Sequence, residues 1–157
     1  MTLAATSASA RILILASLMS LAGAGQVWAQ EPATAAPAPS AEPALNIELN
    51  ALEPLDKGCR LTFVVTNRLG GELTKASVEL ALFDKTGFVD RLTVLDFTDM
   101  PEGKTKVSRF DIPGADCAGI GRILVNEVTG CAGPGLDLAA CRKGLATSAR
   151  AEIEFGM

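Results

Sequence analysis

The sequence predicts an all-β protein, an antiparallel sandwich of about seven short strands with a short helical turn before the last strand. Two observations carry this prediction. Apolar and polar residues alternate with a period of two in several short segments between residues 45 and 155, as they do in strands with one buried face. Turn-forming glycine, proline, asparagine and aspartate residues separate these segments.

The first three predicted strands show the alternation most clearly. Segment 45–50 opens the fold, and segments 59–66 and 76–83 follow it. Residues 84–87 read Asp-Lys-Thr-Gly, which predicts a tight hairpin with Gly87 in the left-handed conformation. The residues expected to face the core are Leu45, Ile47, Leu49, Cys59, Leu61, Phe63, Val65, Ala76, Val78, Leu80 and Leu82.

The fourth predicted strand, 88–97, changes its phase. Its apolar residues alternate through Leu92 and Val94, but Leu95 and Phe97 fall on the other parity, so we expect a β-bulge near Val94. Strand 104–112 then buries Phe110 and Ile112, and the last strand turns Ala149, Ala151, Ile153 and Phe155 inward. The remaining predicted elements are strands over 120–128 and 147–155, with a helical turn within 136–145.

The spacing of these strands favours immunoglobulin-like connectivity. Val65-Thr66-Asn67 ends a strand with asparagine, Val78–Gly87 ends in an aromatic-Asp-x-x-Gly hairpin, and Pro101-Glu102-Gly103 forms a turn before Phe110. This pattern, over about residues 59–113, resembles the FxLYD-type and related immunoglobulin-like modules of bacterial envelope proteins, although Phe83 stands where that family usually has tyrosine. The resemblance implies an immunoglobulin-like fold in an extracytoplasmic setting and carries over no catalytic residues.

The N-terminal segment has the features of a secretory signal peptide. A polar lead with one basic residue, Arg11, precedes an apolar run over 12–24, and Val27-Trp28-Ala29 provides a cleavage motif. We therefore expect residues 1–29 to be removed, so that the mature chain begins at Gln30. The alternative is an uncleaved anchor, but the apolar run is shorter than the roughly 20 residues that span a bilayer.

Residues 30–44 predict a tether between the signal peptide and a folded domain over 45–157. Four prolines lie here among small residues, which cannot bury enough apolar surface to offset the entropy of ordering. The simplest interpretation is a disordered Pro/Ala-rich spacer. A peptide-recognition strip is the alternative, but no Pro-x-x-Pro flanked by basic residues supports it.

All four cysteines lie in the portion expected to be exported, which indicates two disulfides. If consecutive strands run up and down, Cys59 and Cys117 lie at one end of the sandwich, and Cys131 and Cys141 lie at the other. Because bridged Cα atoms lie within about 7 Å, we predict the pairs Cys59–Cys117 and Cys131–Cys141. Zinc binding and redox activity are disfavoured, because no Cys-x-x-Cys pair occurs.

The composition disfavours most catalytic classes. Histidine is absent, which removes the commonest general base and metal ligand. A net charge of −4 with interspersed signs gives no footprint for nucleic acid or an anionic membrane. The glycines after residue 113 form no phosphate-binding motif, and the aspartates form no calcium loop. We therefore expect no catalytic residue, cofactor or metal, and no membrane insertion after cleavage.

Recognition by surface is the function that remains. Val64, Phe83, Val89 and Leu95 fall off the inward parity and form the candidate partner surface, unless they pack under a loop or on the second face of an internal strand. An edge strand could also accept a partner's strand. We hypothesise an exported, non-catalytic module that binds another cell-envelope protein. The alternatives are an accessory or chaperone-like subunit of an envelope transport or assembly system, and an enzyme, which would need a concave polar pocket.

Overall fold

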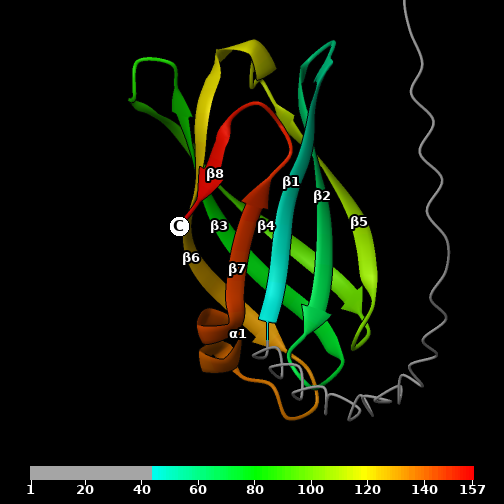
Figure 1. Ribbon diagram of the computed structural model, residues 1–157. Coiled ribbons are helices and arrows are strands. Elements are labelled where there is room, and N and C mark those ends of the chain that lie inside the picture. The colour runs from blue at the N-terminus through cyan, green and yellow to red at the C-terminus, as the bar shows by residue number, and fades with distance from the viewer. Residues whose placement is uncertain (1–43) are drawn as a thin grey trace, which may run out of the picture. The chain divides into compact units, whose positions relative to one another are not determined.

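The computed structural model describes residues 44–157, which form two packed β-sheets (Figure 1). These residues form the all-β sandwich that the sequence predicts, with eight strands among residues 44–157. The strands are β1 (Ala44–Leu55), β2 (Gly58–Arg68), β3 (Leu73–Asp84), β4 (Val89–Met100), β5 (Thr105–Pro113), β6 (Ile120–Ala132), β7 (Leu145–Ala149) and β8 (Glu154–Gly156). A 3-10 helix, η1 (Cys117–Gly119), precedes β6, and an α-helix, α1 (Leu138–Gly144), precedes β7.

The two sheets divide the strands between them. Sheet A has the order β5-β2-β1-β7, and sheet B has the order β4-β3-β6-β8. The chain therefore crosses between the sheets after β2, β4, β5, β6 and β7. The order β5-β2-β1 opposite β4-β3-β6 is the immunoglobulin-like connectivity that the strand spacing favours.

The core lies between the sheets, where every inward residue predicted for β1, β2 and β3 is buried. Phe63 of β2 lies at its centre. The Phe63 ring centroid lies 5.6 Å from that of Phe97 in β4, 6.1 Å from Phe110 in β5 and 5.8 Å from Phe155 in β8. Burying an aromatic side chain contributes roughly 1.5–3 kcal/mol. This aromatic cluster therefore joins strands of both sheets.

The phase of β4 differs from the prediction. Leu95 and Phe97 face the core and are 4% and 1% exposed, whereas Leu92 and Val94 face solvent and are 56% and 52% exposed. The register with β3 shifts between Leu82 and Phe83, which leaves Asp90 as the extra residue of β4. The bulge lies directly after the hairpin and sets the phase of the whole strand, so the expectation of a bulge near Val94 was wrong.

The predicted last strand is divided into two. β7 ends at Ala149, and the chain bends over 150–153 before β8 returns alongside β6 (Figure 1). The backbone N–H of Arg150 donates to the carbonyl oxygen of Leu49 at 2.9 Å, where the ladder with β1 ends. β7 pairs with β1 and β8 pairs with β6 in parallel, so the sandwich is not wholly antiparallel. Of the four residues predicted to face inward here, only Phe155 is fully buried.

Two disulfides lie at opposite ends of the sandwich (Figure 1). Cys59 of β2 is joined to Cys117 of η1, and Cys131 of β6 is joined to Cys141 of α1, with Cα–Cα distances of 5.1 and 6.1 Å. This pairing confirms the prediction from strand direction. The helical turn that carries Cys141 begins after Asp137, whose carboxylate accepts the backbone N–H of Ala140 at 2.8 Å.

The predicted signal peptide over 1–29, its cleavage after Ala29 and almost all of the predicted tether over 30–44 lie outside the described residues. Ala44, at the end of that tether, is already the first residue of β1. Within residues 44–157, no helix has the length and apolar character needed to cross a membrane.

Candidate partner-binding surface

The outer face of sheet B carries three large hydrophobic residues that are more than half exposed. Val89, Leu92 and Val94 are 55%, 56% and 52% exposed, and all three belong to β4, the edge strand of this sheet. Leu92 pairs with Ala81 of β3, and Ala81 pairs on its other side with Leu124 of β6. We call this surface the β4 face, and it comprises Ala81, Phe83, Val89, Leu92, Val94 and Leu124.

The exposure of the β4 face follows from the position of β4 in the sheet. Ala81 lies between two neighbouring strands and is only 4% exposed, because the side chains of Leu92 and Leu124 flank it. Leu92 and Val94 have a neighbouring strand on one side only. Adjacent exposed apolar side chains of this kind make this surface the candidate for contact with a partner.

Paired charges surround the β4 face. The guanidinium of Arg122 lies over the Phe83 ring, 5.4 Å from its centroid, and its Nε lies 3.4 Å from Glu154 Oε1. Lys75 Nζ lies 3.0 Å from Asp96 Oδ2, and Ser77 Oγ donates to Asp96 Oδ1 at 2.6 Å. The Ser77 hydroxyl and then the Lys75 ammonium lower the pKa of Asp96.

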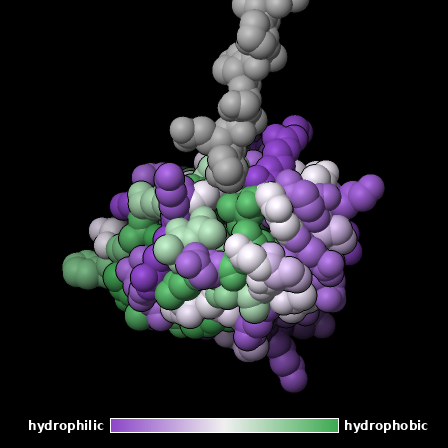
Figure 2. All heavy atoms as spheres, turned by 90° about the horizontal axis from the view of Figure 1, so that it is seen from below, coloured by the Kyte–Doolittle hydropathy of each residue, from purple (hydrophilic) through white to green (hydrophobic). Residues whose placement is uncertain are grey.

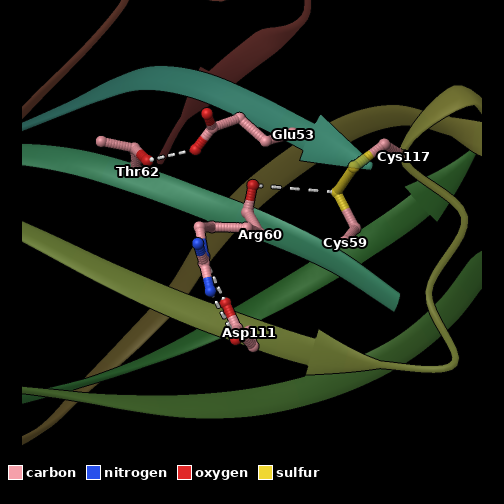
Figure 3. A network of polar contacts seen from close by, with 6 residues as sticks. All are labelled: Glu53, Cys59, Arg60, Thr62, Asp111 and Cys117. Atoms are coloured by element: carbon pink, nitrogen blue, oxygen red, sulfur yellow. Dashed lines mark hydrogen bonds and ion pairs between the residues drawn. A yellow bond between two sulfur atoms is a disulfide. The ribbon is translucent and has the colours of Figure 1, made fainter. Parts of the chain in front are cut away.

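The outer face of sheet A is polar by contrast. Arg60 Nε lies 2.6 Å from Asp111 Oδ1, and Thr62 Oγ1 donates to Glu53 Oε2 at 3.4 Å (Figure 3). The hydrogen bond to Asp111 raises the pKa of Arg60, and the same bond lowers the pKa of Asp111. Figure 3 also shows that this network lies next to the Cys59–Cys117 disulfide. Val107, at 53% exposed, is an apolar residue on this polar face.

A shallow groove lies between the edges of β4 and β5, beside the β4 face. Leu95 and Val94 line it from β4, and Phe110 and Ile112 line it from β5. Arg109 of β5 also lines the groove. Arg60 and Asp111, which pair with each other, line it as well, so the groove combines apolar side chains from both sheets with a net positive charge.

The end of the sandwich that Figure 2 shows is mixed in character. In this view hydrophobic residues are more frequent on the side of β6 and α1, and the side of β5 is mostly polar. The polar side agrees with Thr105 and Lys106 at the start of β5 and with Lys104 just before it, which are exposed or half-buried. The edge of β5 is therefore less suited to an apolar contact than the edge of β4.

The structure brings two of the four predicted surface residues together. Phe83 and Val89 are paired in the β3–β4 ladder and both lie on the β4 face. Leu95 is 4% exposed and belongs to the core, so its assignment to the partner surface was wrong. The cause is the bulge at Asp90, which reverses the expected parity of β4. Val64 is half-buried and lies in sheet A, away from the other two.

Sequence reasoning missed Leu92 and Val94, the two most central exposed residues of β4. The alternation of Leu92 and Val94 with Thr93 is visible in the sequence, but alternation alone does not say which face is inward. No local residue marks Asp90 as the extra residue of β4, because Gly87, in the left-handed conformation, belongs to the hairpin turn itself.

The carboxylates at the hairpin end of the sandwich are already engaged. Asp84 Oδ1 accepts hydrogen bonds from Thr86 and from the backbone N–H of Phe88, and the Thr86 hydroxyl contributes most to lowering the pKa of Asp84. Asp90 pairs with Arg91, and Asp116 caps η1. Among residues 44–157, no group of three or more histidine, cysteine, aspartate or glutamate side chains is placed to hold a metal ion.

The comparisons with known proteins returned no relative. No protein-family model matches the chain, and no curated protein and no solved structure is significantly similar to it.

Proposed function

We propose that this protein is an exported, non-catalytic β-sandwich module that binds another cell-envelope protein through the β4 face. The observation that carries the proposal is the exposure of Val89, Leu92 and Val94, each more than half accessible, on an edge strand beside a groove. Burying two such side chains in a complex contributes roughly 1.5–3 kcal/mol each before the cost of association. The partner is expected to present an apolar segment to this surface.

The extracytoplasmic setting supports the choice of partner. Two disulfides close the two ends of the sandwich, and such bonds form and persist in oxidising compartments. A protein stabilised in this way meets its partners in the periplasm or outside the cell. The partner is therefore expected to be an envelope or secreted protein.

Photo-cross-linking in the cell tests the proposal. A photoreactive amino acid placed at Leu92 is expected to yield a defined cross-linked species, and the same amino acid at Val107, which is as exposed but lies on the polar face, is expected to yield none. The captured protein is then purified and its affinity for the wild-type chain is measured. A cross-link from Val107 alone, or none from either position, overturns the proposal.

Substitution gives the quantitative arm of the same test. A double variant, Leu92→Asp with Val94→Asp, is expected to weaken binding of the purified partner by at least about tenfold, because two apolar contacts are replaced by desolvated charges. Val107→Asp with Ser108→Asp adds the same two charges on β5, is the matched control, and is expected to leave the affinity unchanged. Equal losses in the two variants would show that the partner binds elsewhere or responds only to net charge.

A further inference from the structure

The backbone of β4 turns hydrogen-bonding groups toward an uncovered edge. Lys106 Nζ of β5 donates to the carbonyl oxygen of Thr98 at 2.7 Å, so this carbonyl points away from β3. In an antiparallel strand the N–H and C=O of one residue point to the same side, and the side alternates along the chain. The N–H and C=O groups of Leu92, Val94 and Asp96 therefore point to the free edge of β4 as well.

A contact on the other side of β3 agrees with this orientation. Ser77 of β3 pairs with Asp96 of β4. The carbonyl oxygen of Ser77 accepts a hydrogen bond from Thr129 Oγ1 of β6 at 3.4 Å, so it points toward β6 and away from β4. Asp96 consequently makes no backbone hydrogen bond to Ser77, and its own N–H and C=O face the free edge.

Side chains close the two ends of this edge and leave its middle open. Arg91 Nη1 donates to the carbonyl oxygen of Pro113 at 2.7 Å, and its Nη2 lies 3.3 Å from that of Gly114. At the other end of this edge, Lys106 Nζ donates a hydrogen bond to the carbonyl oxygen of Thr98. Within the described part of the chain, the segment Leu92–Asp96 lies between these two closures with no strand paired to its outer side.

The groove lies where an added strand would place its inward side chains. A strand paired to Leu92–Asp96 extends sheet B toward β5, and its alternate side chains point into the space lined by Leu95 and Phe110. Its other side chains lie on the outer face beside Leu92 and Val94. A backbone ladder and two apolar contact surfaces therefore meet at one site.

The charges beside the groove favour an acidic ligand. Arg109 lines the groove together with the Arg60–Asp111 pair, and Lys106 lies outside the groove, on the carbonyl oxygen of Thr98 of the same edge. Among residues 44–157, neither Arg109 nor Lys106 has a carboxylate within 4.0 Å, whereas Asp90 and Asp96 of β4 are each paired with a cation. A carboxylate on the incoming strand would meet uncompensated positive charge at this edge.

We infer that the β4 edge binds an extended acidic peptide segment of its partner by strand addition, pairing it with Leu92–Asp96 and seating its apolar side chains over Leu95 and Phe110. This inference rests on the proposed function and specifies its mode. The ligand class is an extended segment in which apolar residues alternate with others that include aspartate or glutamate.

Amide hydrogen exchange tests the edge without any ligand. In the free mature chain, the N–H groups of Leu92 and Val94 are expected to exchange quickly, and those of Thr93 and Leu95, which bond to β3, are expected to exchange slowly. Slow exchange at Leu92 and Val94 would show that the edge is already paired, and it would overturn the inference.

A peptide probe tests binding. Random peptides displayed on phage are selected against the mature chain, and an enriched peptide is synthesised. It is expected to slow exchange at Leu92 and Val94 with little change at Thr93, and to show alternating apolar residues with an excess of aspartate and glutamate. Failure to enrich any peptide, or protection confined to another region, overturns the inference.

Proline substitution isolates the backbone donor. Val94→Pro removes the free N–H without breaking a bond to β3, and Val94→Ala removes the same side chain but keeps the N–H. The peptide is expected to bind Val94→Pro at least about tenfold more weakly than Val94→Ala. Equal affinities overturn strand addition. The purified envelope partner can also be measured with these variants. If it binds Val94→Pro and Val94→Ala equally but binds the double aspartate variant more weakly, the proposed function holds and the partner binds through side-chain contacts alone.

Charge reversal checks the preference for acid. Arg109→Glu is expected to weaken binding of the selected peptide several-fold and to reduce its dependence on salt. Lys143→Glu in α1 makes the same change in net charge outside the groove and serves as the control. Equal effects of the two substitutions would contradict a specific role for Arg109 in binding acidic residues of the ligand.

Discussion

At the scale of single residues, Asn67 explains how two loops at one end of the sandwich, β2–β3 and β4–β5, are held together. Its side chain is buried, and Nδ2 donates to the carbonyl oxygens of Gly71 and Met100, both at 2.8 Å. The side-chain Oδ1 accepts a hydrogen bond from the backbone N–H of Leu69 at 3.1 Å. The backbone carbonyl oxygen of Asn67 accepts a hydrogen bond from the backbone N–H of Gly103 at 2.8 Å. Asn67, next to the end of β2, thus satisfies backbone polar groups that would otherwise be buried or half-buried without a partner.

Replacing this side chain is therefore expected to be costly. Asn67→Ala leaves two buried carbonyl groups and one N–H without their partner, and we expect the free energy of unfolding to fall by at least about 2 kcal/mol. Urea denaturation measures this change. Asn126→Ala is the control, because the Asn126 side chain is exposed and bonds only to Glu79, and its effect is expected to stay within about 0.5 kcal/mol. A loss at Asn67 as small as the control's would contradict this account.

At the scale of elements, the sequence was informative where the hydrophobic period ran without interruption. The inward residues of β1, β2 and β3 were predicted correctly because each strand keeps one parity over its whole length. The same reasoning failed for β4. The extra residue Asp90 has no recognisable sequence signal, and it exchanges the inward and outward positions of all later residues in the strand. Leu95, one of the four candidate surface residues, was consequently assigned to the wrong face.

The C-terminal strands show a second limit. The alternation from Ala149 to Phe155 suggested one strand, but the chain passes from sheet A to sheet B between β7 and β8. Whether a segment continues in one sheet or crosses to the other depends on which neighbour offers a free edge. β1 and β6 offer those edges here, and both lie far from this segment in the sequence. Local periodicity does not contain that information.

The two disulfides close loops of different length, which predicts how much each one stabilises the fold. The Cys59–Cys117 bond closes a sequence separation of 58 residues and the Cys131–Cys141 bond one of 10. The loop-entropy relation gives a stabilisation of about 4 kcal/mol for the first and about 3 kcal/mol for the second. The double variant Cys59→Ala with Cys117→Ala should therefore unfold at a lower urea concentration than the double variant Cys131→Ala with Cys141→Ala. The reverse order would show that local packing, rather than chain entropy, sets their contributions.

At the scale of the whole molecule, stability and compartment are coupled. Each disulfide fastens one end of a sandwich whose aromatic core joins both sheets, and Cys59 and Cys141 are fully buried. In a reducing cytoplasm the four thiols stay unpaired, and the fold loses the contribution of both cross-links. The protein is therefore expected to reach full stability only after export. This connects the predicted N-terminal signal peptide to the folded domain by a physical requirement.

Mass spectrometry of the protein produced with its N-terminal segment in a bacterium tests that connection. The exported form is expected to begin at Gln30 and to be lighter than the reduced chain by the four hydrogens lost in forming two disulfides. The chain without residues 1–29, made in a reducing cytoplasm, is expected to retain free thiols and to unfold at a lower urea concentration. Oxidising that sample should restore the midpoint of the exported form. Recovery of intact Met1 in the membrane fraction would contradict cleavage, and equal midpoints for the reduced and oxidised chains would contradict the dependence of stability on compartment.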